Sequence, residues 1–105
     1  MVQVKDWLSP ILTEAVLAWS GWQSAAAPRR DASALRQRFG DKIAADLLPV
    51  IKSIEDEFYS SQARYEARNL REMEEIASSD FRAKHPDAPE DIVRAFAWCY
   101  AFDYK

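Results

Sequence analysis

Five aromatic residues occupy alternate positions near the end of the sequence, from Phe96 to Tyr104. Each such ring removes roughly 150 to 250 Å² from water when it is buried. At about 25 cal/mol per Å², the segment offers several kcal/mol to whatever covers it. The cover is the chain's own core, a second copy of the chain or a different protein. Any fold of this sequence must therefore place a large apolar load within one short segment.

The length and composition predict one helical domain over residues 1–105. Hydrophobic residues make up 49% of the chain and charged residues 30%, which is typical of a globular protein. Only two glycines are present, which argues against a turn-rich all-β fold. The net charge is −3, no apolar stretch approaches membrane-spanning length, and the single cysteine suits a reducing compartment. We expect a cytoplasmic protein that does not enter membranes.

The first helix is predicted from apolar residues that recur at steps of three and four between Val4 and Trp22. Ser9 and Pro10 are typical of an N-cap and a first helical turn. The regular helix is therefore expected to begin at Pro10, with residues 2–8 as a packed lead-in.

A second, short helix is predicted over about 31–39, with Asp31 as its N-cap and Gly40 at its end. Asp41 then caps a third segment. Within it, Pro49 lacks a backbone donor and clashes with the preceding turn, which predicts a kink or a break.

Residues 50–77 contain neither glycine nor proline and are rich in strong helix formers, which predicts one long helix. Its length would be about 42 Å at 1.5 Å per residue, whereas a compact domain of this size has a radius of gyration of about 13 Å. The helix should therefore extend beyond the core. A polar stretch between Ser60 and Asn69 is the expected place for a bend or a partner-facing patch.

The last helix is predicted from about 88 to 102. Asp87, Pro89 and Glu90 resemble a capping box with proline in the first turn. Apolar residues occupy so much of the helix circumference that both sides should be buried.

The favoured fold class is all-α, a small bundle of four to six helices with one long central helix that is open to kinking. The aromatic alternation also permits an α+β alternative. In that alternative, residues 95–104 form a strand that pairs with residues 2–5 as a two-stranded ribbon.

The sequence predicts no catalytic, cofactor-binding or metal-binding residues. His85 and Cys99 are the one histidine and the one cysteine, so a Cys/His zinc site is absent, as are the Glu-x-x-His motifs of di-iron proteins. The carboxylates at 55–57 and 72–75 are interpreted as solvated helix faces with ordinary i,i+4 ion pairs. An enzyme that uses Cys99 or these acidic clusters is the third function considered.

A second function considered is a DNA-binding regulator that uses residues 29–42. Five basic residues lie in this segment, in an order that loosely resembles a helix-turn-helix. The second helix, however, would carry Asp41 and Asp46 toward the phosphates, which would repel them. We therefore do not favour a nucleic-acid partner.

The leading hypothesis is a non-enzymatic protein-binding domain: an inhibitor, an immunity-type protein, an adaptor or a self-associating subunit. The small, acidic, helical composition resembles that of toxin-neutralising immunity proteins and phage inhibitors. Tyr, Trp and Arg dominate interface hot spots, and the long helix and the aromatic C-terminal segment carry all three. The partner is a protein, with a homodimer as the first option. The predicted partner-binding residues are Tyr59, Arg64, Tyr65, Arg68, Arg71, Trp98 and Phe102.

Overall fold

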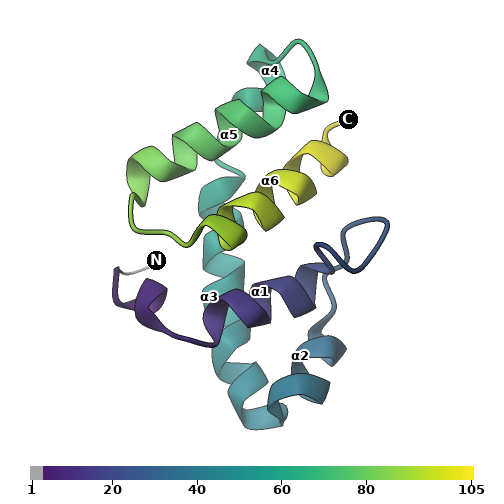
Figure 1. Ribbon diagram of the computed structural model, residues 1–105, viewed down its shortest axis with the longest axis vertical. Helices are drawn as coiled ribbons and strands as arrows, with labels where there is room; N and C mark the ends of the chain where they lie inside the picture. The colour runs from purple at the N-terminus through teal and green to yellow at the C-terminus, as the bar shows by residue number, and fades with distance from the viewer. Residues whose placement is uncertain (1–3) are drawn as a thin grey trace.

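The computed structural model describes residues 4–105, and every regular element in that range is helical (Figure 1). A short 3-10 helix is followed by six α-helices: η1 Val4–Leu8, α1 Leu12–Ser20, α2 Ala32–Phe39, α3 Asp41–Phe58, α4 Ala63–Glu66, α5 Leu70–Lys84 and α6 Glu90–Asp103. The all-α fold class is confirmed. The ribbon alternative is wrong for residues 95–104, because α6 contains nearly all of them. Residues 2 and 3 of that ribbon lie outside the described residues.

The long helix α3 is the central element around which the others are arranged (Figure 1). Helix α2 packs on α3, while α5 and α6 pack on each other beside its C-terminal end. Helix α1 contacts α2, α3 and α6, so it joins the two halves of the molecule. The resulting body measures 41 × 30 × 17 Å. No helix among the described residues has the length and apolar character needed to cross a bilayer.

A long, bent central helix was predicted and is present, but its bounds differ from those expected. Helix α3 has 18 residues and continues through Pro49 without a break, and the 30° bend belongs to a longer helical stretch of 26 residues. The chain leaves helical geometry after Phe58 and becomes regular again only in α4 and α5. The prediction of one helix over 50–77 is therefore wrong.

A tertiary contact accounts for this interruption. The Tyr100 hydroxyl of α6 donates to the carbonyl of Ser61 at 2.8 Å and accepts from the backbone N–H of Arg64 at 3.1 Å. Both backbone groups would otherwise pair within a continuous helix. At the far end of the break, the Asn69 side chain caps α5 by accepting from the backbone N–H of Glu72 at 2.9 Å.

The helix ends confirm some of the predicted caps and correct others. Asp31 caps α2 by accepting from Ala34, as predicted. Helix α1 begins at Leu12 rather than Pro10, and no side chain caps it. Helix α6 begins at Glu90 without a capping box, because the Glu90 carboxylate accepts from Arg82 and Arg94 instead.

The core is organised around the ring of Phe58, the last residue of α3. Its centroid lies 5.2 Å from that of Phe81 in α5, 6.0 Å from Phe96 and 6.2 Å from Tyr100 in α6. Trp19 of α1 joins the same group through Phe96, at 5.9 Å. The Phe58 ring thus joins α3 directly to α5 and α6, and Phe96 extends the group to α1.

The alternating aromatic run divides between the core and the surface. Phe96 and Tyr100 are buried, Trp98 is half-buried, and Phe102 and Tyr104 are exposed. The chain's own core therefore covers only part of the apolar load that the run carries.

Replacing Pro49 by alanine should stabilise the protein. Pro49 is exposed in the middle of α3, so little packing is lost. Proline is about 3 kcal/mol less favourable than alanine in a helix interior. We expect P49A to raise the free energy of unfolding in urea by about 1 to 3 kcal/mol, while the control D46A in the same helix changes it by less than about 0.5 kcal/mol. A lower stability for P49A would contradict this account of α3.

Candidate functional site

All four tyrosines of the chain gather in one group with two arginines, which we call the tyrosine–arginine cluster. Its members come from four separate parts of the chain: Arg30, Tyr59, Arg64, Tyr65, Tyr100 and Tyr104. The rings of Tyr59 and Tyr104 lie 5.9 Å apart, and those of Tyr100 and Tyr104 lie 4.8 Å apart. Helix α4 and the C-terminus lie at the same end of the molecule, where the cluster is located (Figure 1).

In one half of the cluster, the charge of Arg30 is neutralised by two carboxylates within a hydrogen-bonded network. Arg30 donates to Glu55 at 2.6 Å and to Asp103 at 2.8 Å, and the Tyr59 hydroxyl donates to Asp103 at 2.5 Å. Burial, reinforced by the hydrogen bond to Asp103, raises the pKa of Tyr59 above its usual range. Partial burial lowers the pKa of Arg30, but the hydrogen bonds to Asp103 and Glu55 outweigh it and raise that pKa overall. This network fastens the segment before α2 to α3 and α6.

The other half centres on Arg64, whose guanidinium lies between two tyrosine rings. Its carbon is 4.7 Å from the ring centroid of Tyr65 and 4.7 Å from that of Tyr104. Nη1 also donates to the carbonyl of Ser61 at 3.0 Å and to the Tyr100 hydroxyl at 3.3 Å. Contacts with the hydroxyls of Tyr65 and Tyr100 raise the pKa of Arg64, so the group stays cationic. No carboxylate among the described residues pairs with it.

The structure brings some of the predicted partner-binding residues together and separates others. Tyr59, Arg64 and Tyr65 belong to the cluster, and Phe102 lies in the same helical turns as Tyr100 and Tyr104, with Lys105 over its ring. Phe102 is 37% exposed, and Tyr65 is 73% exposed.

The remaining predicted residues lie outside the cluster. Arg68 and Arg71 form exposed i,i+4 pairs with Glu72 and Glu75, at 2.9 and 3.3 Å. Trp98 is half-buried and is not among the ring contacts of the cluster.

Sequence reasoning missed three members of the cluster as site residues. Tyr100 in α6 and Tyr104, which directly follows α6, are four residues apart, and that spacing on one face of the predicted helix was the available signal. Arg30 gave no such signal, because its partners Glu55 and Asp103 are 25 and 73 residues away.

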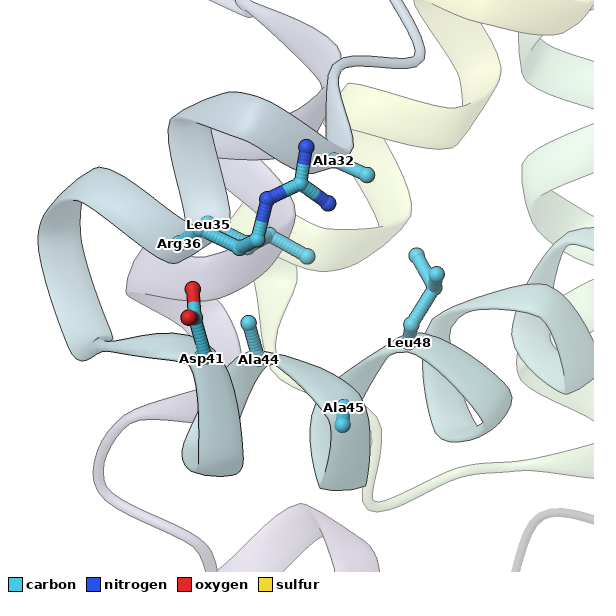
Figure 2. Close-up of a pocket in the computed structure, with 7 residues that line it drawn as sticks. All are labelled: Ala32, Leu35, Arg36, Asp41, Ala44, Ala45 and Leu48. Atoms are coloured by element: carbon cyan, nitrogen blue, oxygen red, sulfur yellow. The ribbon is translucent and has the colours of Figure 1, made fainter.

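The basic segment considered for DNA binding is partly neutralised. Arg30 pairs with Glu55 and Asp103, and Arg38 pairs with Glu14 at 3.2 Å. Between α2 and α3 lies a hollow of about 190 Å³ with Arg36 and Asp41 among its lining residues (Figure 2). This volume is below the roughly 300 to 1,000 Å³ of typical ligand pockets. Its other lining residues are Ala32, Leu35, Ala44, Ala45 and Leu48.

The residues considered for enzymatic chemistry have structural contacts. His85 lies at the end of α5, 3.1 Å from a carboxylate oxygen of Glu57, with its ring beside Trp7 and Phe81. Cys99 is buried in α6, and burial raises the pKa of its thiol to about 12. Within residues 4–105, no three His, Cys, Asp or Glu side chains are placed to hold a metal ion.

Comparison with protein-family models, with curated proteins and with solved structures finds no match to this chain.

Replacing Tyr100 by phenylalanine should destabilise the protein although the ring is retained. The substitution leaves the Ser61 carbonyl without its hydroxyl donor and the Arg64 N–H without its acceptor. An unsatisfied buried polar group costs about 1 to 3 kcal/mol. We expect Y100F to lower the free energy of unfolding by that amount, and Y65F, in which the altered side chain belongs to a residue that is 73% exposed, to lower it by less than about 0.5 kcal/mol. Equal stability of Y100F and the wild type would contradict the proposed role of the hydroxyl.

Cys99 should resist alkylation in the folded protein. With a pKa of about 12 and a buried side chain, the thiol carries little reactive thiolate at pH 8. We expect iodoacetamide to modify native Cys99 at least about a hundredfold more slowly than the urea-unfolded chain, as followed by mass spectrometry. Similar rates in both states would revive the nucleophile hypothesis.

Proposed function

We propose that this chain is a non-enzymatic protein-binding domain and that its contact surface is the exposed part of the tyrosine–arginine cluster together with Phe102. The observation that carries the proposal is Tyr65. Its ring is 73% exposed, yet the guanidinium of Arg64 lies against it. A solvent-facing aromatic ring that the fold holds in place is suited to receiving a partner.

The residue types of this surface support the proposal. Tyrosine and arginine are enriched at interface hot spots, because they bring large contact areas and hydrogen-bonding groups together. Tyr104 and Phe102, 39% and 37% exposed, extend the apolar area beside Tyr65. In the described part of the chain, the other exposed large apolar side chains are Leu70, at the start of α5 beside α4, and Leu8 and Ile43, which lie in η1 and α3.

The contacts within the cluster lower the entropic cost of binding. Immobilising a flexible side chain at an interface costs about 0.5 to 1.5 kcal/mol. Arg64 is already held by Ser61, Tyr100 and two rings, so most of that ordering precedes binding. A partner would therefore meet a preformed surface.

The proposal is tested by photo-crosslinking with p-benzoylphenylalanine in place of Tyr65 in the native cell. We expect an adduct of discrete mass, and we expect Y104A in the same chain to reduce its yield at least about tenfold, as for loss of a hot-spot residue. L8A is the matched control, because Leu8 is 80% exposed and lies in η1. An adduct that forms equally in the Y104A chain, or no adduct at all, would refute this surface as the binding site.

A further inference from the structure

Two ionic groups that form no ion pair within residues 4–105 flank the most exposed aromatic ring of that part of the chain. Arg64 precedes Tyr65 and Glu66 follows it. Among the described residues, neither of these charges forms an ion pair, although Arg68 and Arg71 nearby both do. Because these two charges have opposite sign, the surface around Tyr65 can be complementary in charge to the same surface on a second copy of the chain.

Arg64 and Glu66 are two residues apart in α4, so their side chains leave the helix in nearly opposite directions, with Tyr65 between them. Arg64 lies toward α6, between the rings of Tyr65 and Tyr104. Glu66 lines a hollow of about 340 Å³ together with Asp80 and Lys84 of α5. A two-fold axis that lies in the interface plane and passes Tyr65 would exchange these sides between two copies. Each copy would then face the Arg64 of the other with its own Glu66.

We propose that a second copy of this chain docks on α4 about such an axis, with Tyr65 near the axis and Arg64 of each copy paired with Glu66 of the other. The inference rests on the proposed function and names its partner. A guanidinium has five N–H donors, which is more than the contacts of Arg64 with Ser61, Tyr100 and the Tyr65 hydroxyl require. Arg64 therefore retains donors for a carboxylate while its position is already fixed.

The surroundings of α4 suit a dimer contact. Four of the six large apolar side chains that are exposed within residues 4–105 belong to α4, the start of α5 and the C-terminal end of α6. These parts of the chain lie at the same end of the molecule (Figure 1). The four side chains are Tyr65, Leu70, Phe102 and Tyr104. An apolar surround of this kind excludes water from a central ion pair and strengthens it. The two charges would thus fix how one copy is aligned on the other, and the exposed apolar side chains would provide the contact area.

Charge reversal tests the pairing, with the dimer dissociation constant measured by analytical ultracentrifugation. We expect the wild type to dimerise with concentration. We expect R64E and E66R alone each to raise the dissociation constant at least about tenfold, because like charges then face each other twice across the axis. An equimolar mixture of R64E and E66R should restore association to within about threefold of the wild type, because every contact across the axis is again between opposite charges.

Two controls separate a lost contact from a lost fold. D46R reverses an exposed charge in α3, away from α4, and should leave the dissociation constant unchanged. E66R should keep the thermal unfolding midpoint of the monomer, because Glu66 makes no ion pair within the described chain. Restored association in the mixture would also show that R64E still folds, because only a folded chain presents this surface.

The outcomes distinguish this inference from the function on which it rests. A wild-type chain that stays monomeric at millimolar concentration overturns the inference, as does a mixture that fails to re-associate. If the crosslinker at position 65 then captures a different protein and Y104A prevents it, the binding surface stands and a foreign partner occupies it. If neither copy nor foreign protein is captured, both proposals fail.

Discussion

The packing of the Phe58 ring against the rings of Phe81, Phe96 and Tyr100 is the interaction on which the rest of this structure depends. Phe58 is the last residue of α3, so the central helix ends where α5 and α6 pack together. Aromatic rings at such distances add to the free energy gained from burying their area. The turn that follows α3 begins next to this contact, and the tyrosine–arginine cluster is built on that turn. The surface is therefore a direct extension of the core.

Local chemistry made much of the fold predictable, and long-range contacts account for most of what was missed. The Asp31 N-cap and the all-helical fold class could be predicted from the sequence because each depends on residues that are close together in the chain. The interruption between Phe58 and Leu70 was not, since strong helix formers surround it and its cause is a hydroxyl from Tyr100, 36 to 39 residues away. One local signal was overlooked: Asn69, followed three residues later by Glu72, is an N-cap pattern that marks the start of α5.

The candidate site shows the same division. Tyr59, Arg64 and Tyr65 were predicted as partner-binding residues because tyrosine and arginine are typical of interface hot spots, and the structure places them together. Tyr104 and Arg30 reach the same place only through the fold, so periodicity in one segment could not assign them. Arg68 and Arg71 share the composition of the site but lie on the exposed face of the next helix start, paired with Glu72 and Glu75. Residue type alone did not separate these two groups of arginines.

The C-terminal end of α6 contributes to both the core and the surface. Tyr100 is buried in the core, and Tyr104, which directly follows the helix, is exposed. Helix ends fray readily in solution, and local opening there costs little free energy. A molecule that holds Tyr104 against Arg64 would also suppress this fraying, and Tyr100 would pass the effect to Phe58. A bound molecule should therefore slow amide hydrogen exchange in the final turns of α6 and also in the junction between α3 and α4.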